Sequence, residues 1–359
     1  MRRTRSVLAD GREILWYDVD GAPERSAVDT RDLEPRGAAP DLRYDALRQD
    51  WVSVAAHRSG RTFLPAAGDC PLCPSRDGRA TEVPGDDYQV VVFENRFPSF
   101  VGAPDTGSVT DDQFAHHPAW GRCEVVCFTS DHDARFSSLG VDRARLVIDA
   151  WADRTAALSR TPGVEHVFVF ENCGEAIGVT LNHPHGQIYG YPFPPPVARE
   201  QFAAARGYER STGGNLYADL VEAELRDGSR VVLESDHWVA FVPFGARWPV
   251  EVHLHPRRRV ADLSELDDAQ RDDLAVVYLD LLRRGDALYG MRLPYIAAWQ
   301  QAGVHALRDL TPLHLELFSV QRAPDKLKYL AGSESAMGAF INDRSPEEVA
   351  ARLREVGTT

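Results

Sequence analysis

The sequence predicts an α+β protein built from two similar halves, and three observations support this fold class. The order strand–turn–strand–helix–strand–strand occurs twice along the 359 residues. The turn at residues 95–98 has a counterpart at 244–249, and each joins two strand-like runs. A content of 43% apolar and 26% charged residues is ordinary for a globular protein of this length. An internal duplication is the simplest account of the repeat.

The first half is expected over residues 41–197, after a loosely packed arm at 1–40 that is rich in charge, Pro and Gly. Apolar residues between Val141 and Leu158 recur at the spacing of one helical face, which predicts a helix. Residues 101–119 are expected to be loop because Asp, Pro and Gly occur throughout. Strands are expected at 42–57, 88–93, 124–129 and 167–170, and in the His-rich run from residue 183.

The second half, residues 198–359, repeats that order. Helices are expected at 198–226 and 263–284, and strands at 231–233, 238–243, 250–254, 294–299 and 313–320. A last helix runs from Ser345 to Val356, with Ser as N-cap, Pro at the first helical position and acids in the first turn.

Charge and composition exclude several classes of protein. The formal net charge of −14 argues against a nucleic-acid partner, since phosphate-backbone binding needs a basic face. No apolar run approaches the roughly 18 residues that a membrane-spanning helix needs. The basic start, Met1 to Arg5, is not followed by the apolar region of a secretory signal. We therefore expect a cytoplasmic protein that binds neither membrane nor nucleic acid.

The pair Cys70-x-x-Cys73, flanked by prolines, has the spacing of metal ligands rather than of a disulfide. Two further ligands are needed, and the candidates are His132, at a strand end, and His183. Two cysteines and two histidines close a tetrahedral structural zinc site. The alternative is a turn with two buried cysteines and no metal.

The run from His183 to Tyr189 combines two histidines, a glycine and a glutamine after a Gly-containing loop, which suits the handling of a phosphate ester. Our hypothesis is that the neutral imidazole of His185 attacks phosphorus. Gln187 and the loop amides would stabilise the non-bridging oxygens. The alternative is that His185 is a second zinc ligand or a core histidine. The second half keeps only His314 at this place, so we expect covalent chemistry in the first half alone.

A larger set of motifs occurs in order from about residue 43 to the C-terminus. They are His57-Arg58-x-x-Arg61, Cys70-x-x-Cys73, Asn95-x-Phe97, Asp131-His132, Phe170-Glu171-Asn172-x-Gly174, His183-Pro184-His185-Gly186-Gln187, Trp248-Pro249 and Lys328-Tyr329-x-x-Gly332-x-Glu334. In these motifs the chain resembles the galactose-1-phosphate uridylyltransferase family of the histidine-triad superfamily. The resemblance implies two tandem histidine-triad-like half-barrel units, with antiparallel sheets and flanking helices. Residues 41–197 would form the catalytic unit, and 198–359 a unit without the catalytic histidine set.

The resemblance also implies a ping-pong reaction of galactose metabolism, the Leloir pathway. UDP-glucose would uridylylate His185 and release glucose 1-phosphate, and galactose 1-phosphate would then take the UMP to give UDP-galactose. His185 and Gln187 would be the catalytic residues, and one structural zinc ion would be held by Cys70, Cys73, His132 and His183.

The binding residues implied by the resemblance fall into three groups. Uridine and phosphates would meet Asn95, Arg96, Asn172, Gly178, Val179, Thr180 and Gln187. The hexose phosphate would face Lys328, Tyr329, Ser333 and Glu334. Arg58 and Arg61 would reach the site of a neighbouring subunit, because the family is a homodimer with sites between its subunits.

Two departures from the family pattern matter. Some members hold a second metal with one Glu and three His, and this chain has few of those ligands. The residues at or near the corresponding positions are Gln300, Glu316, His314 and one of Glu200 and Gln201. We therefore expect the second metal site to be absent or incomplete. Phe340 falls where some members place a Gln near the sugar, which leaves the preferred hexose open.

Two other functions stay open at this point. A related enzyme, a nucleoside-diphosphate-sugar or dinucleoside-polyphosphate phosphorylase, would use inorganic phosphate as the acceptor. A zinc-stabilised nucleotide-binding protein would bind UDP-sugars without forming an adduct.

Overall fold

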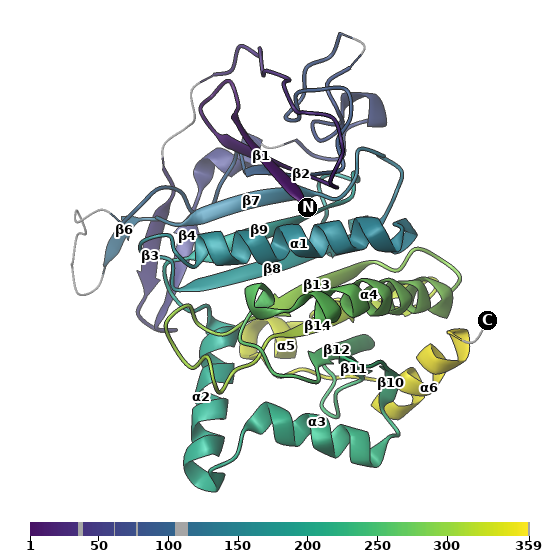
Figure 1. Cartoon of the computed structure of the whole chain (residues 1–359). Helices are drawn as coiled ribbons and strands as arrows, with labels where there is room; N and C mark the ends of the chain where they lie inside the picture. The colour runs from purple at the N-terminus through teal and green to yellow at the C-terminus, as the bar shows by residue number, and fades with distance from the viewer. Residues whose placement is uncertain (35–38, 61, 77, 105–113, 358–359) are drawn as a thin grey trace.

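One antiparallel sheet runs through the whole protein, and helices cover it (Figure 1). The computed structural model describes residues 1–34, 39–60, 62–76, 78–104 and 114–357. Within these residues the sheet has 11 strands, each antiparallel to its neighbours. In spatial order they are β1 (Arg2–Val7), β2 (Glu13–Asp18), β5 (Val90–Glu94), β7 (Arg122–Cys127), β9 (His185–Tyr191), β8 (His166–Cys173), β13 (Tyr295–Gln300), β14 (His314–Ser319), β12 (Val250–Pro256), β11 (Trp238–Phe241) and β10 (Val231–Glu234).

The predicted duplication is visible in the strand order. The first half runs β5, β7, helix α1 (Val141–Leu158), β8 and β9 along the chain, and the second runs β11, β12, helix α4 (Asp268–Leu288), β13 and β14. In space the strands of the two sets follow the same order outward from the central β8–β13 pair, so β9 and β14 occupy equivalent places. The predicted α+β class is confirmed, and the two units share one continuous sheet.

Helices α1 and α4 lie side by side on one face of this sheet (Figure 1). The main core lies beneath them, where Trp151 of α1, Tyr278 of α4 and Trp299 of β13 meet with ring centroids 6.1–6.2 Å apart. An ion pair between Arg271 and Asp149, 3.2 Å apart, joins the two helices at their surface. The residues of α1 are those that the apolar spacing predicted.

The remaining elements surround this centre. They are a small sheet of β4 (Asp50–Val54), β3 (Asp41–Asp45) and β6 (His116–Pro118), the pair β15 (Gln321–Ala323) and β16 (Lys326–Leu327), and the helices α2 (Pro196–Thr212), α3 (Leu216–Asp227), α5 (Gly332–Met337) and α6 (Pro346–Val356). Ser345 caps α6 as predicted, since its hydroxyl accepts from the amide of Glu348. Among the described residues, no helix is both long and apolar enough to cross a bilayer.

Several predicted elements need correction. Residues 1–40 are not simply a loose arm, because β1 and β2 extend the main sheet and β2 is almost entirely buried. The strand expected at 42–57 is a hairpin of β3 and β4, and β6 lies within the loop expected at 101–119, of which residues 105–113 are outside the described residues. The helix expected at 198–226 is two helices, because Gly213 ends α2 in a left-handed conformation with φ +73°.

Candidate active site

Strand β9 places His185 at the centre of the sheet rather than at an edge. β9 pairs with β7 on one side and with β8 on the other. Pro184 is tolerated because it precedes the first residue of the strand. His185 and Gln187 share one face, as the period of two predicts. Gly186 faces the other side, where an added Cβ would lie 2.9 Å from the carbonyl oxygen of Phe170.

The imidazole of His185 is held in one tautomer. Its Nδ1 lies 2.8 Å from the main-chain carbonyl oxygen of His183. A carbonyl oxygen can only accept, so Nδ1 carries the hydrogen and the Nε2 lone pair stays free. Burial lowers the pKa of His185 below its usual value, which keeps the ring neutral near pH 7. A neutral imidazole with a free nitrogen is the form that attacks phosphorus.

The four predicted metal ligands come together. The ligand atoms of Cys70, Cys73, His132 and His183 all lie within 4.8 Å of one another. Cys73 Sγ is 3.4 Å from His132 Nδ1 and 3.5 Å from His183 Nδ1. A tetrahedral zinc ion with ordinary bond lengths separates sulfur and nitrogen by about 3.6 Å, so the cluster has the dimensions of a zinc site.

Groups outside the cluster set the His183 ring for metal binding. His183 Nε2 lies 2.8 Å from the carbonyl oxygen of Thr129 and 2.6 Å from the hydroxyl of Tyr88. The carbonyl requires a hydrogen on Nε2, which leaves the Nδ1 lone pair facing Cys73. Burial raises the pKa of the Cys70 thiol to about 11, so Cys70 needs a bound cation to serve as a thiolate ligand.

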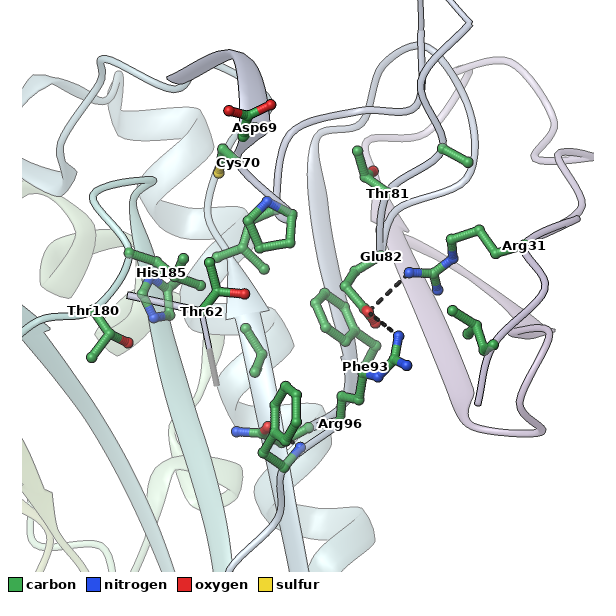
Figure 2. Close-up of a pocket in the computed structure, with 18 of the residues that line it drawn as sticks. Arg31, Thr62, Asp69, Cys70, Thr81, Glu82, Phe93, Arg96, Thr180 and His185 are labelled. Carbon is green, nitrogen blue, oxygen red and sulfur yellow. Dashed lines mark hydrogen bonds and ion pairs between the residues drawn. The ribbon is translucent and has the colours of Figure 1, made fainter. Parts of the chain in front are cut away.

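A cavity of about 650 Å³, which we call the His185 cavity, opens in front of His185. Seven predicted site residues line it: Arg58, Cys70, Asn95, Arg96, Thr180, His185 and Gln187. Figure 2 shows His185 and Thr180 on one side of this cavity, with Phe93, Glu82 and Arg31 on the other. The hydroxyl of Tyr189 donates to Gln187 Oε1 at 3.2 Å, which turns the Gln187 amide NH₂ toward other partners.

Other predicted residues lie elsewhere. Asn172 and Val179 line a smaller hollow of about 350 Å³ that His185 and His183 also border. Gly178 ends the short helix η4 (Glu175–Ile177) with φ +82° and lines neither space. Arg58 lines the cavity of its own chain and donates to the carbonyl oxygen of Phe97 at 2.6 Å, and its expected reach into a neighbouring subunit stays a prediction. Arg61 is outside the described residues.

The four residues expected at the hexose phosphate do not line the His185 cavity of their own chain. Lys328 is buried, with its Nζ 2.7 Å from a carboxylate oxygen of Glu334 and 3.0 Å from the carbonyl oxygen of Arg247. Ser333 donates to the carbonyl oxygen of Ala339 at 2.9 Å. Tyr329 is 77% exposed and so is free to meet another molecule.

The sequence did not reveal the charged far wall of the cavity. Glu82 accepts from Arg31 at 2.9 Å and lies 3.8 Å from Arg96 (Figure 2). It also accepts from the buried Arg12 at 2.5 Å. Arg79 also lines the cavity. No motif links these residues, which come from separate segments, so only the fold identifies them.

The second half carries a strand equivalent to β9 with different side chains. His314 begins β14 as His185 begins β9, and its Nδ1 lies 3.1 Å from the carbonyl oxygen of Pro312. Two residues on, Glu316 stands where β9 has Gln187. Although burial alone would raise the pKa of Glu316, the hydrogen bond from His314 and other groups lower it to about 2. Gln201 and Gln300 donate to this carboxylate at 2.9 and 3.3 Å.

Models of one protein family match both halves of the chain. The model of the family described as galactose-1-phosphate uridyl transferase, N-terminal domain, matches residues 30–195. The model of its C-terminal domain matches residues 201–357.

Named relatives agree with both models. A galactose-1-phosphate uridylyltransferase of Streptomyces lividans is 47% identical, covering 99% of this chain and 98% of the relative. One of Thermotoga maritima is 34% identical, covering 88% and 98%.

Solved structures show the same fold. One described as uridylyltransferase is 31% identical with a TM-score of 0.79, covering 89% of this chain and 98% of the other. An ADP-glucose phosphorylase from Arabidopsis thaliana has a TM-score of 0.68 at 23% identity, covering 88% and 99%, and shares the fold. The matched residues span both halves, and the chain belongs to the galactose-1-phosphate uridylyltransferase family.

Proposed function

We propose that this protein exchanges UMP between UDP-glucose and galactose 1-phosphate through a uridylyl-His185 intermediate. The observation that carries this proposal is the fixed tautomer of His185, whose free Nε2 belongs to a residue lining a cavity of about 650 Å³. The family relatives are named for this activity.

In the first half-reaction, His185 Nε2 attacks the α-phosphorus of UDP-glucose. The new N–P bond forms as the bond from phosphorus to the bridging oxygen breaks, and glucose 1-phosphate leaves with that electron pair. The ring becomes cationic, and the Nδ1–H bond to the His183 carbonyl strengthens as charge develops. The Gln187 amide donates to a non-bridging oxygen, where negative charge builds up.

In the second half-reaction, a phosphate oxygen of galactose 1-phosphate attacks the same phosphorus. The N–P bond breaks, UDP-galactose forms, and the electron pair returns to Nε2. One difficult exchange becomes two easier steps through the covalent intermediate.

We propose one zinc ion, held by Cys70, Cys73, His132 and His183, with a structural role. The four protein ligands fill a tetrahedral shell, so no position remains for substrate. The ion would fix the backbone of His183, whose carbonyl orients His185. We propose that the second metal site is absent or incomplete, because Glu316 accepts hydrogen bonds from two glutamine side chains, Gln201 and Gln300.

We also propose a homodimer in which each subunit completes the other's site. The supporting observation is that Lys328, Tyr329, Ser333 and Glu334 lie outside their own chain's cavity, and that Tyr329 is exposed. A partner subunit is the means by which these residues would meet the hexose phosphate.

The deciding experiment is intact-mass measurement after incubation with UDP-glucose alone. Wild-type protein should gain the mass of a uridylyl group, and His185→Ala should not. The matched control is His314→Ala, which removes the equivalent histidine of the second half and should still form the adduct. An adduct that persists in His185→Ala, or an active wild type that forms none, would rule out the mechanism.

The acceptor is tested separately, starting from the isolated adduct. Galactose 1-phosphate should discharge it to UDP-galactose, and inorganic phosphate should do so far more slowly. Faster discharge by inorganic phosphate would identify a phosphorylase instead.

A further inference from the structure

Arg79 presents a buried hydrogen-bond donor for which the described residues supply no acceptor. One terminal nitrogen of its guanidinium, Nη2, donates to the carbonyl oxygen of Cys70 at 3.1 Å. The other, Nη1, is buried and has no hydrogen-bond partner among the described residues. Buried donors without acceptors are rare in folded proteins, and a charged one is costly. Arg79 lines the His185 cavity, so a ligand in that cavity is the available acceptor.

The surroundings of Arg79 suit an aromatic ring that carries a carbonyl group. Its Nη2 is held at the Cys70 carbonyl, immediately before Pro71 and Leu72, which both line the cavity. Phe93 and Val125 add further apolar surface to the same cavity. Small-molecule sites combine such apolar walls with a few fixed polar groups that set orientation.

The nucleophile restricts which part of the substrate lies there. A nucleotide with its phosphorus at His185 places its phosphate oxygens beside Gln187 and its base farther along the cavity. The apolar segment at Pro71 and Leu72 suits a base and offers little to a diphosphate. The guanidinium of Arg79 is anchored to that segment by the Cys70 carbonyl.

We propose that Arg79 donates a hydrogen bond from Nη1 to a carbonyl oxygen of the pyrimidine base, and thereby selects uracil nucleotides over adenine nucleotides. Uracil has two ring carbonyl groups, and adenine has none. A site built around a hydrogen bond rejects a ligand that lacks the matching group, because the buried donor is then left unpaired. This inference rests on the proposed function, since it places a uridine nucleotide in the His185 cavity.

The test is titration calorimetry of the full-length protein with UMP, CMP and AMP. Arg79→Met keeps most of the side-chain length and removes the donors. It should weaken UMP binding by about 10- to 100-fold and change AMP binding less than about twofold. If the 2-carbonyl is the acceptor, Arg79→Met should weaken CMP binding as much as UMP binding, because cytosine keeps that group. If the 4-carbonyl is the acceptor, the variant should change CMP binding as little as AMP binding. Both results agree with the proposal.

The matched control is Arg76→Met, an exposed arginine of the same turn that does not line the cavity. It should leave all three affinities unchanged. If Arg79→Met does not fold, Arg79→Lys is the second variant, because it keeps the charge and lacks the planar guanidinium. It should also weaken UMP binding more than AMP binding, by a smaller factor than Arg79→Met.

Two results would overturn the proposal. An equal loss for UMP, CMP and AMP would mean that Arg79 contacts phosphate, and an unchanged UMP affinity would mean that it only supports the turn. The adduct measurement on wild-type protein is independent of both. A wild type that forms the His185 adduct while Arg79→Met binds UMP normally disproves only the role of Arg79.

Discussion

The Nδ1 atom of His185 lies 2.8 Å from the carbonyl oxygen of His183, so the two histidines of one motif have different tasks. The side chain of His183 faces the cysteine pair, and its main-chain carbonyl orients His185, the proposed nucleophile. The proposed metal site and His185 Nε2 are therefore connected through a single residue. A change in the main-chain position of His183 would therefore change the orientation of the His185 ring.

Removal of one cysteine ligand should lower metal content and stability together. We expect Cys70→Ser to lose most of its zinc and to melt at a lower temperature than wild type, because bound metal contributes folding free energy. Atomic absorption and thermal unfolding measure the two effects. Cys173→Ser is the control, since Cys173 lies outside the cluster. Wild-type protein purified without any zinc would contradict the prediction.

Gln187→Glu gives the first half the residue type that the second half has at the equivalent place, Glu316. A carboxylate beside the phosphate would repel it and could not donate, so we expect the rate of adduct formation to fall by at least about 100-fold. Gln187→Met removes the donor without adding charge and should lose less. Rapid-quench measurement with UDP-glucose gives both rates, and equal rates for the two variants would argue against the electrostatic explanation.

Stability should depend on His166 at acid pH. Burial lowers the pKa of His166 to about 4, below the unfolded value of about 6.5. The unfolded chain therefore binds the proton first, so this contribution to stability is complete above about pH 6.5 and is lost as the pH falls toward 4. The loss approaches about 3 kcal/mol.

Chemical denaturation of wild type and His166→Gln between pH 7 and pH 4 tests this. The free energy of unfolding should fall more steeply for wild type than for the variant. Parallel curves would show that His166 does not cause the dependence.

Mixed dimers should regain activity that neither parent has. His185→Ala lacks the nucleophile, and Tyr329→Ala lacks an exposed residue expected at the partner's hexose phosphate. If the sites lie between subunits, one site of a mixed dimer contains both wild-type residues. We expect up to about half the wild-type turnover per dimer after refolding the two variants together. Absence of recovery in verified mixed dimers would mean that Tyr329 does not complete the site of the partner subunit.

Local patterns predicted much of the fold and the centre of the site. The bounds of α1 follow from apolar spacing, and the metal cluster from the Cys-x-x-Cys pair with two histidines near strands. These signals need only near neighbours in the sequence or a few ligand types. The repeated element order predicted the matching strand orders around β9 and β14.

Features that depend on distant partners escaped prediction. The charge, Pro and Gly content of residues 1–40 suggested a loosely packed arm, but Arg3 pairs with Asp153 at 2.9 Å and Arg5 pairs with Glu13 at 2.6 Å. Those partners become visible only when the chain is folded. The same holds for the wall of the cavity around Glu82, where arginines from separate segments meet.

The pairing of β8 with β13 has an evolutionary consequence. These strands are equivalent members of the two halves, and they run antiparallel to each other at the centre of the sheet. A strand that pairs antiparallel with its own copy is what a two-fold axis produces between identical subunits. The chain thus has the architecture of an ancestral dimer joined by gene fusion. In a fused chain each copy can change alone, and the two copies here carry different residues at one equivalent place, Gln187 and Glu316.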